Sequence, residues 1–559
     1  MLSHVKKHII SKIIELADRP LEVNIKTLRQ LLTLGKYGNG EITFCLPKEA
    51  EKLLGKEISL SNFNSDSVIA KVHETNSSTP ETKLISFAIN KNYFIKTIFS
   101  FGINNATNRE KEHVLVEYSS PNIAKPFHIG HLRSTIVGNF VANCAHKMFG
   151  KVTRLNYLGD WGAQVGYVKV GLDDLGVSDK QLNEDPISIL YKAYVHAHSQ
   201  PGNLEKAKQI FSELEDDTCS QEQRDFWERV RQITMQNLKE TYLDLGITFD
   251  EYFYESDYRK ARIKELLIKL ENCGIAKKRQ LDGLLVLCPS SKVEIPLLRE
   301  DGSSLYLSRD IAAAFDRLKK YNDCSKMYYV VDKSQEQHLA NVAEAIFSLT
   351  GRDVIKHVPF GRVTGVSSRK GTTLLLQDIL EKATVAMALQ QRASDNSRTD
   401  DPEVTKILAV TTLMIYILRQ ARCRDFVFNW DNAMQGKGDT GVKLQYTHCR
   451  LCSLEEICGV EAPTVCEPDL LTEPLLLEII LEIARSEEVI QFSMENMESS
   501  NLVSYLFKLC NLLSRSLRHI AVKGQPKDIA QQRLLVFLKA RQTLAECMSL
   551  LGLKPLRQM

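Results

Sequence analysis

The sequence has no long hydrophobic run and no cysteine framework. Its longest largely apolar segment, residues 407–418, ends at Arg419, well short of the roughly 20 residues that a membrane-spanning helix needs. The 13 cysteines are scattered singly along 559 residues, which favours a reducing compartment over a disulfide-stabilised secreted fold. Internal repeats and low-complexity tracts are also missing. We therefore expect no transmembrane segment and a chain of roughly three to four domains.

The net charge is too small to predict a nucleic-acid partner on its own, because it is only +3. The charges are nevertheless divided near the end of the chain. Residues 455–498 hold twelve acids and one base, whereas residues 508–559 hold ten lysines and arginines against two acids. A basic helical segment can follow a phosphate backbone. The alternative is a solvated face that pairs with the acidic helices.

A lone C-x-x-C pair, Cys449 and Cys452, lies beside His448. A structural zinc site of the finger type needs a second pair of ligands at a set spacing, and the sequence offers none there. We expect these cysteines to lie on the face of a helix, and we expect no protein-bound metal.

The most informative segment runs from Pro121 to His131. A run of alternating β-branched and aromatic residues predicts a strand over 113–120 before it, and a helical pattern follows over 131–140. The N–H groups and the dipole at a helix N-terminus favour phosphate. Two histidines can donate to phosphate oxygens there, and Gly130 lets a flat base lie close to the backbone because it has no Cβ. The segment therefore predicts a nucleotide site.

Residues 128–131 read His-Ile-Gly-His, which resembles the HIGH signature of the class I aminoacyl-tRNA synthetases. Residues 117–127 read Glu-Tyr-Ser-Ser-Pro-Asn-Ile-Ala-Lys-Pro-Phe, which is similar to the arginyl-tRNA synthetase form of that signature. Further stretches resemble motifs of the same family: residues 159–164, 438–448 and 551–559. The resemblance covers most of the chain from the predicted strand onward, whereas the first hundred residues match only loosely.

The order of the predicted elements indicates an α/β multidomain protein. Residues 1–108 mix helix and strand signals and predict a small α+β domain, which the resemblance implies to contact tRNA. Residues 109–385 alternate strands and helices, which predicts a Rossmann-type, doubly wound parallel sheet, with a helical insertion at about 173–250. Residues 400–559 are almost wholly helical. They predict an all-α bundle, to which the resemblance gives anticodon binding.

The N-terminal residues allow two interpretations. Residues 1–14 carry lysines and histidines but no acid, and their apolar residues follow helical spacing. This is typical of an organelle-targeting helix, although such peptides prefer arginine. The alternative is the first helix of the N-terminal domain. Because residues 445–456 look closest to animal mitochondrial members of the family, we expect the mitochondrial matrix, with the cytoplasm as the alternative.

The sequence also suggests how an arginine side chain would be held. A guanidinium is a planar fork that carboxylates bind best in bidentate pairs, and Glu117 and Asp310 are candidates for this role. The resemblance implies that Tyr306 and Gln335 complete the side-chain pocket. It assigns the backbone and α-amino group of arginine to Ser120, Pro121, Asn122 and His131. Lysine would leave buried acceptors unsatisfied in such a pocket, so we expect no editing activity.

One motif departs from the wider class. Class I enzymes usually carry Lys-Met-Ser-Lys-Ser on a loop that contacts pyrophosphate, whereas residues 365–371 here read Gly-Val-Ser-Ser-Arg-Lys-Gly. Many arginyl enzymes show this degeneracy and place a lysine just before the first signature, as Lys125 stands here. We assign catalytic contacts with the phosphates to His128, His131 and Lys125. ATP binding is assigned to these three residues together with Gly130, Val366, Ser367, Arg369 and Lys370.

The resemblance implies an arginine–tRNA ligase. Such an enzyme activates L-arginine with ATP to arginyl-adenylate, releases pyrophosphate and passes arginine to the 3′-terminal ribose of tRNA(Arg), with Mg²⁺ bridging the ATP oxygens. The family also implies that activation requires bound tRNA. We expect a monomer without a membrane partner. Two alternatives stay open: a non-catalytic synthetase-like protein that binds tRNA, and another HIGH-type nucleotidylyl transferase, which would not need the long helical domain.

Overall fold

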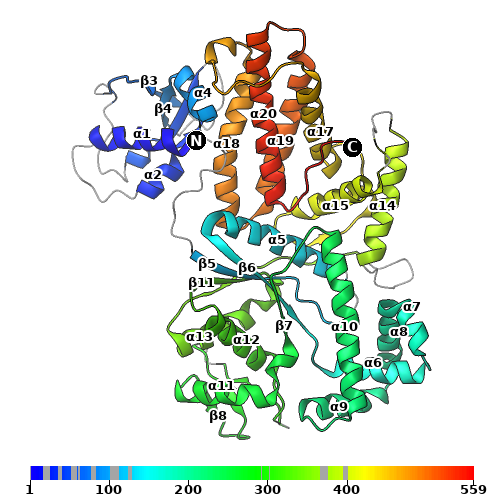
Figure 1. Ribbon diagram of the computed structural model, residues 1–559. Coiled ribbons are helices and arrows are strands. Elements are labelled where there is room, and N and C mark those ends of the chain that lie inside the picture. Colours follow the sequence, from blue (N-terminus) through cyan, green and yellow to red (C-terminus); the bar gives the residue numbers. More distant parts are fainter. Residues whose placement is uncertain are drawn as a thin grey trace.

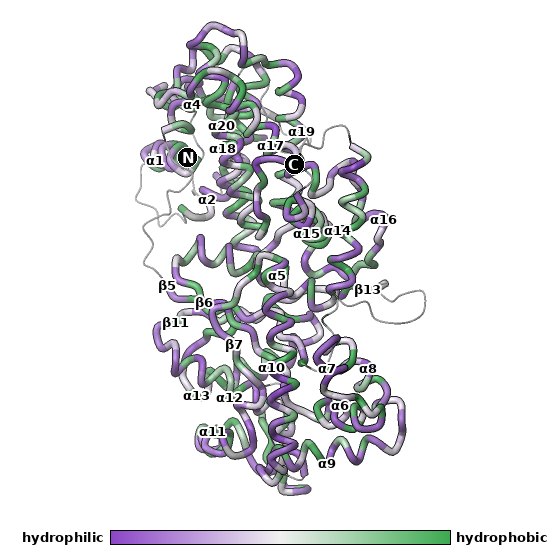
Figure 2. Tube along the Cα trace, turned by 45° about the vertical axis from the view of Figure 1, so that its right-hand side comes forward, coloured by the Kyte–Doolittle hydropathy of each residue, from purple (hydrophilic) through white to green (hydrophobic). Residues whose placement is uncertain are grey.

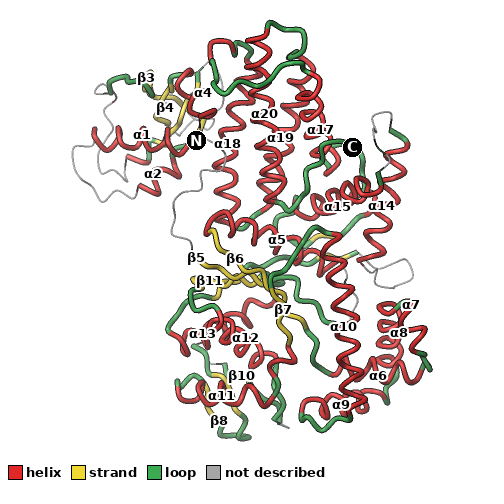
Figure 3. The backbone as a smooth tube through the Cα atoms, in the orientation of Figure 1, coloured by secondary structure: helices red, strands yellow, loops and turns green. Residues whose placement is uncertain are grey.

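The chain is described by a computed structural model in which three parts are connected in sequence order (Figure 1). The described residues are 2–16, 25–35, 41–51, 60, 63–76, 83–100, 112–123, 127, 129–290, 293–300, 302–365, 376–394, 399 and 401–559. A parallel sheet lies near the middle of the molecule, with helices on both of its faces (Figure 3).

The N-terminal part is an antiparallel sheet with helices packed beside it. Its strands lie in the order β1-β2-β4-β3. The strands are β1 (Thr33–Leu34), β2 (Ile42–Pro47), β3 (Ile69–Asn76) and β4 (Lys83–Ile89), and the helices are α1 (Leu2–Leu16), α2 (Ile25–Leu31) and α4 (Lys91–Ser100). This part contacts the C-terminal helices through α1 and α4.

Helix α1 is a folded element of this part. Its apolar residues, among them Val5, Ile9 and Ile13, are buried. Lys6, also buried, donates to the carbonyl of Arg29 at 3.1 Å and forms an ion pair with Glu488. In the structure, residues 2–16 therefore form the first helix of the N-terminal part.

The central sheet has five parallel strands in the order β12-β11-β5-β6-β7. Their bounds are β5 (Glu112–Glu117), β6 (Gly150–Leu158), β7 (Glu251–Tyr254), β11 (Cys324–Tyr329) and β12 (Ile355–His357). In β5 every residue after Glu112 is buried, as expected for a central strand covered on both faces. The prediction of a Rossmann-type parallel core is confirmed.

Helix α5 (Ile129–Phe149) connects β5 to β6 and packs closely on the sheet. A Cβ at Gly138 would lie 2.2 Å from Cβ of Tyr118, so only glycine allows this approach. The other helices around the sheet are α11 (Lys260–Asn272), α12 (Tyr306–Lys320) and α13 (Glu336–Thr350), with the short helices η2 (Glu255–Tyr258) and η3 (Lys333–Gln335).

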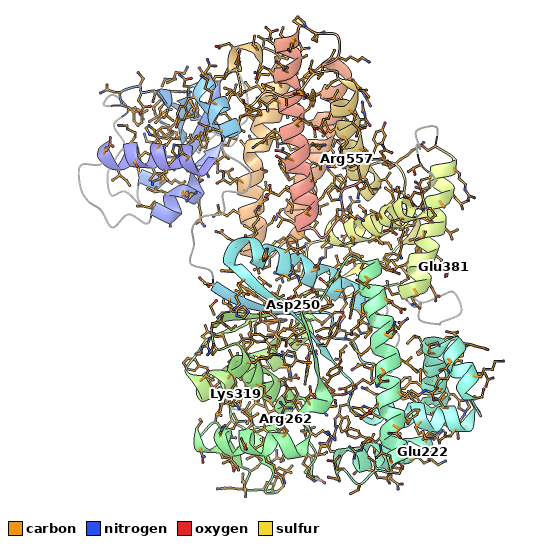
Figure 4. All side chains as sticks on the ribbon, viewed as in Figure 1. Glu222, Asp250, Arg262, Lys319, Glu381 and Arg557 are labelled. Carbon is orange, nitrogen blue, oxygen red and sulfur yellow. The ribbon has the colours of Figure 1, made fainter. Side chains whose placement is uncertain are left out.

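A helical insertion separates β6 from β7. Its helices are α6 (Ala163–Asp174), α7 (Asp179–Glu184), α8 (Pro186–Ser199), α9 (Asn203–Glu215) and α10 (Gln221–Asp244). Asp250 joins its end to the sheet, because Oδ2 accepts the backbone N–H of Arg154 at 2.7 Å (Figure 4). A small antiparallel sheet follows α11 and is formed by β8 (Ala276–Lys278), β9 (Leu285–Leu287) and β10 (Ile295–Pro296).

The C-terminal part is helical. Its helices are α14 (Leu376–Arg392), α15 (Pro402–Leu418), α16 (Trp430–Ala433), α17 (Gly441–Ile457), η4 (Pro468–Leu470), α18 (Pro474–Asn496), α19 (Ser499–His519) and α20 (Lys527–Leu550). Strand β13 (Val363–Thr364), which precedes α14, pairs with β14 (Phe426–Val427), which follows α15. Hydrophobic and hydrophilic residues alternate along these helices (Figure 2), as amphipathic helices require. None of the helices in the described part of the chain combines the length and apolarity needed to cross a bilayer.

Ion pairs join the basic and acidic segments that the sequence separates. Lys508 pairs with Glu482, and Arg541 pairs with Glu455, each at 2.6 Å. Three more pairs connect the same segments: Arg515 with Glu478, Arg533 with Glu473, and Arg557 with Glu456. For these five bases the interpretation as partners of the acidic helices holds. Other bases stay exposed, namely Arg518, Lys523 and Lys527.

Candidate active site

A cavity of about 170 Å³ lies where β5 and β11 end beside α12 and α13. The carboxyl ends of parallel strands are where α/β sheets commonly bind ligands. Of the residues that the sequence assigns to the arginine side chain, Glu117, Asp310 and Gln335 all line this cavity. The full lining is Glu117, Tyr157, Asp310, Ala313, Arg317, Tyr329, Val331, Gln335, His338, Leu339 and Val342.

Glu117, the last residue of β5, forms a buried ion pair with Arg317 of α12. The two residues are only 5% and 1% exposed. Oε2 of Glu117 accepts from Nη1 of Arg317, and Oε1 accepts from Ser120 Oγ at 3.3 Å. Burial raises the pKa of Glu117, and the charge of Arg317 opposes that rise. The cavity therefore already contains the carboxylate–guanidinium contact that an arginine substrate would make.

Asp310 of α12 is paired with His338 of α13. Oδ2 of Asp310 lies 2.6 Å from Nε2 of His338, and both side chains are half-buried. Burial lowers the pKa of His338, but the hydrogen bond to Asp310 and its negative charge outweigh burial, so the pKa is raised. The charge on this side of the cavity therefore depends on whether His338 carries a proton. Gln335, at the end of η3, adds a neutral amide.

The sequence reasoning missed the two basic partners of the carboxylates. Their spacing carries a signal, because Arg317 follows Asp310 by seven residues and His338 follows Gln335 by three. Residues three, four or seven apart share one face of a helix.

With one permanent cation, Arg317, and two carboxylates, the cavity is net negative whenever His338 is neutral. That balance suits a cationic ligand.

Tyr306 lies apart from the other predicted pocket residues. It is the first residue of α12 and is 57% exposed, and it does not contribute to the lining of the cavity. The guanidinium carbon of Arg309 lies 5.0 Å from the centre of its ring. In this structure Tyr306 therefore stacks on Arg309 and does not contact the carboxylates.

The backbone turns unusually after β5. Ser119 and Ser120 have φ angles of 74° and 46°, a left-handed conformation that residues other than glycine adopt rarely and that often marks functional sites. The N–H of Ser119 donates to Ser134 Oγ and that of Ser120 donates to Asn156 Oδ1, both at 3.1 Å. These side chains therefore hold the turn that leads away from Glu117.

Pro121 and Asn122 come next and lie against the end of β6. The N–H of Gly159 donates to the carbonyl of Pro121 at 3.1 Å, and Asn122 forms an isolated β-bridge with Gly159. A Cβ at Gly159 would lie 2.1 Å from Oδ1 of Asn122. A side chain at this position would therefore displace the amide of Asn122 where the two loops of the site meet.

The Asp160-Trp161 pair that follows joins the helical insertion to the core. Asp160 is fully buried and accepts from the N–H and Oγ of Ser256 at 2.9 and 2.6 Å. Trp161 donates to Glu215 of α9, and the Trp227 indole of α10 donates to the carbonyl of Asp160 at 3.1 Å. The motif thus fixes the loop after β6 to the helical insertion and to η2.

The predicted nucleotide residues begin helix α5, which starts at Ile129. Gly130 and His131 lie in its first turn, and the ring of His131 lies 5.4 Å from that of Phe127 between ring centres. The remaining assignments fall outside the described residues: Lys125, His128, Val366, Ser367, Arg369 and Lys370.

Comparison with known proteins agrees with this fold. Residues 95–430 match the family of class I tRNA synthetases (R), catalytic domain, and residues 444–559 match the DALR anticodon binding domain. A probable mitochondrial arginine–tRNA ligase of Bos taurus is 36% identical, with 85% of each chain covered. A probable cytoplasmic arginine–tRNA ligase of Dictyostelium discoideum is 34% identical, with 80% of this chain and 81% of that protein covered.

Among solved structures, arginyl-tRNA synthetase of Thermus thermophilus has a TM-score of 0.82, covers 100% of both chains and is 20% identical in sequence, which shows a shared fold. The parallel sheet and the catalytic-domain match define a class I aminoacyl-tRNA synthetase. More specifically, the chain belongs to the arginyl-tRNA synthetase family.

Proposed function

We propose that this chain, an arginine–tRNA ligase by its family, holds the substrate guanidinium between Glu117 and Asp310. The observation that supports the proposal is that both carboxylates face one cavity of about 170 Å³ together with the amide of Gln335. Two carboxylates and a neutral acceptor match the five donors of a planar guanidinium. Lysine offers only a point charge and would leave part of this set unpaired.

The residues around the cavity would place the rest of the amino acid. The backbone and α-amino group are proposed to bind Ser120, Pro121, Asn122 and His131. The first three residues lie in and after the turn that follows Glu117, and His131 lies in the first turn of α5. Tyr306 begins the helix that carries Asp310. It is proposed to complete the pocket once its ring leaves Arg309.

The chemical step needs positioning more than a reactive side chain. The arginine carboxylate attacks the α-phosphorus of ATP in line, so the protein has to align the two and neutralise charge on the phosphates. The N-terminus of α5, which begins at Ile129, favours negative charge there through the helix dipole. His131 is proposed to donate there, together with His128, and Lys125 to balance the pyrophosphate, while Gly130, Val366, Ser367, Arg369 and Lys370 complete the ATP site.

Mg²⁺ is proposed to arrive with ATP. In the part of the chain that the structure describes, no group of three or more His, Cys, Asp or Glu side chains could hold a metal ion. The cation would be bound by phosphate oxygens of ATP, where it would neutralise the charge of the leaving pyrophosphate.

The proposed partner is tRNA(Arg), held by the helical domain from residue 400 onward and met by residues 1–108. The match of residues 444–559 to an anticodon binding domain supports this division. The mitochondrial matrix is the proposed compartment, because several relatives are named as mitochondrial. Cell fractionation tests this, and recovery of the chain in the cytosol alone would reject it. A monomer is proposed, and sedimentation of the purified chain measures it.

The decisive experiment for the function is aminoacylation of total tRNA with each standard amino acid. It is run beside arginine-dependent exchange of pyrophosphate into ATP, with and without tRNA. We expect charging with arginine only, and exchange only when tRNA is present. Tight binding of tRNA without charging by any amino acid would instead identify a non-catalytic relative, and exchange without arginine would identify a different nucleotidylyl transferase.

A further inference from the structure

Arg133 is buried inside the protein, and within the described part of the chain its side chain donates to main-chain carbonyls. It lies on α5, two residues after His131, and is 1% exposed. Its Nη1 and Nη2 donate to five carbonyl oxygens at 2.7–3.4 Å: those of Gly361, Arg362, Ala421, Arg422 and Arg424. Its guanidinium carbon also lies 4.9 Å from the centre of the Phe426 ring. We call Arg133 with these five carbonyls the Arg133 clamp.

The clamp joins two chain segments that are far apart in the sequence. Residues 361–364 lead into β13, and residues 419–425 connect α15 to β14. The segments also bond to each other, because the N–H of Gly361 donates to the carbonyl of Arg422 at 2.9 Å. A Cβ at Gly361 would lie 2.6 Å from the carbonyl of Arg424. At Gly361 the two segments therefore lie so close together that a side chain there would meet the backbone of Arg424.

A second set of bonds extends from the clamp to the helical domain. The N–H of Arg422 donates to Glu498 at 3.0 Å (Oε2) and 3.3 Å (Oε1), and Glu498 caps the start of α19. The Arg422 side chain donates to the carbonyl of Pro359. Ser499 Oγ donates to the carbonyl of Leu418 at 2.9 Å. Helix α5 is thus bonded, through one peptide unit, to the turn between α18 and α19.

Charge adds to the strength of this connection. Burial lowers the pKa of Arg133 to about 10, with Asp425 opposing the change, so the group is still protonated at neutral pH. Hydrogen bonds from a charged donor are about twice as strong as neutral ones. A neutral side chain at this position would supply at most two donors to the same five acceptors.

We propose that Arg133, acting through Arg422 and Glu498, is a positioning residue that fixes the first turn of α5 relative to the helical domain. In this arrangement a tRNA bound to the helical domain is held at a set position relative to the nucleotide site. The inference rests on the proposed roles of α5 and of the helical domain. It predicts that the clamp affects turnover with tRNA far more than the affinity for tRNA.

The test is a cycle in which Arg133→Gln is combined with a tRNA(Arg) transcript whose anticodon has been replaced. With the wild-type enzyme we expect the replacement to lower kcat as well as tRNA affinity. With Arg133→Gln we expect kcat to fall on the order of 10- to 100-fold on the native tRNA, the cost of a misplacement of about 1 Å. Replacing the anticodon should then lower kcat little further, since changes within one connected network are not additive.

Direct binding separates positioning from a general loss of structure. Arg133→Gln should bind tRNA within about threefold of the wild type and bind arginine without change, because Glu117 and Asp310 do not touch the clamp. Arg133→Lys keeps the charge but loses the planar fork of donors, so its kcat should lie between that of the wild type and that of Arg133→Gln.

A second variant covers the case in which Arg133→Gln does not fold. Glu498→Ala removes the acceptor of Arg422 and a helix cap. In this variant too, kcat should be low on the native tRNA, and replacing the anticodon should lower it little further. Its matched control is Asp401→Ala, which removes the cap of α15, where Asp401 accepts the N–H of Glu403 at 2.9 Å. With Asp401→Ala, replacing the anticodon should lower kcat by the same factor as with the wild-type enzyme.

Independent, additive effects of the variants and the anticodon on kcat would overturn the proposal. The proposal would also be overturned if replacing the anticodon left the kcat of the wild-type enzyme unchanged, because the clamp would then have no effect of the anticodon to carry to the nucleotide site. Failure of the wild-type enzyme to charge tRNA with arginine in the same assay would count instead against the proposed function itself.

Discussion

Asp310 Oδ2 and His338 Nε2 lie 2.6 Å apart inside the cavity that also contains Glu117. A guanidinium that binds Asp310 has to compete with the imidazolium form of this histidine. The pair therefore makes the affinity for arginine depend on a proton, and it leads to the first prediction.

The KM for arginine should rise as the pH falls. Asp310 raises the pKa of His338 above its ordinary 6.5, so the histidine becomes protonated as the pH falls through that raised value and neutralises Asp310. The effect on stability has the opposite sense, because the ion pair stabilises the fold fully below the ordinary pKa and weakens as the pH rises through the raised one. Steady-state kinetics from pH 6 to 9 measure the first effect. His338→Gln should flatten the profile, whereas His146→Gln, an exposed change on α5, should not.

Asp310→Asn should raise the KM for arginine strongly and leave tRNA binding nearly intact. Losing one partner of a largely desolvated charge pair costs on the order of 2–5 kcal/mol, which corresponds to about 30- to 5,000-fold. Asp316→Asn is the control, because Asp316 lies on the same helix and pairs at 2.9 Å with Arg262 outside the cavity. A KM close to the wild-type value for Asp310→Asn would show that arginine is held elsewhere.

Glu117→Gln should lower the stability of the fold as well as arginine activation. It leaves the guanidinium of Arg317 buried without a counter-charge, which costs roughly 3–5 kcal/mol. The double variant Glu117→Gln/Arg317→Met should regain much of the lost free energy of unfolding, since no buried charge is left, but it should not regain activity. Chemical denaturation and pyrophosphate exchange, measured on the same samples, separate the two effects. Equal stability of the single and double variants would contradict this account.

Gly138→Ala should destabilise the catalytic domain through overpacking. The added Cβ would meet the Tyr118 side chain at 2.2 Å, and extra methyl groups in a packed core cost about 1–3 kcal/mol. Gly202→Ala serves as the control, because a Cβ there has no neighbour within 4 Å. Thermal unfolding of the two variants compares them directly, and equal Tm values would mean that α5 can move away from β5 without cost.

The sequence predicted the central elements well where the hydrophobic pattern is local. The β-branched run after Glu112 and the helical pattern after His131 appear as β5 and α5. Strand β11, which spans Cys324–Tyr329, is harder to recognise from a local pattern. Its first half is polar, and it becomes a strand because it pairs with β5, which is a long-range interaction that local propensity does not contain.

The partners of the site residues were beyond local reasoning for the same reason. Glu117 and Asp310 are recognisable as acids in family-like motifs, but the pairing of Glu117 with Arg317 spans 200 residues. Arg133 showed no signal at all in the sequence, because its acceptors are carbonyl groups, which every residue carries. Only the folded chain brings them together.

That last property has a consequence for inherited variation. The acceptors of the Arg133 clamp are main-chain carbonyls, so Ala421 and Arg424 can be replaced by other residues without loss of the acceptor. Arg133 is different, because only arginine has the donors that bind all five carbonyls. Gly361 is different as well, because a side chain there would meet the backbone of Arg424. Harmful missense changes in this region should therefore concentrate at codons 133 and 361, while codons 421 and 424 drift freely between lineages.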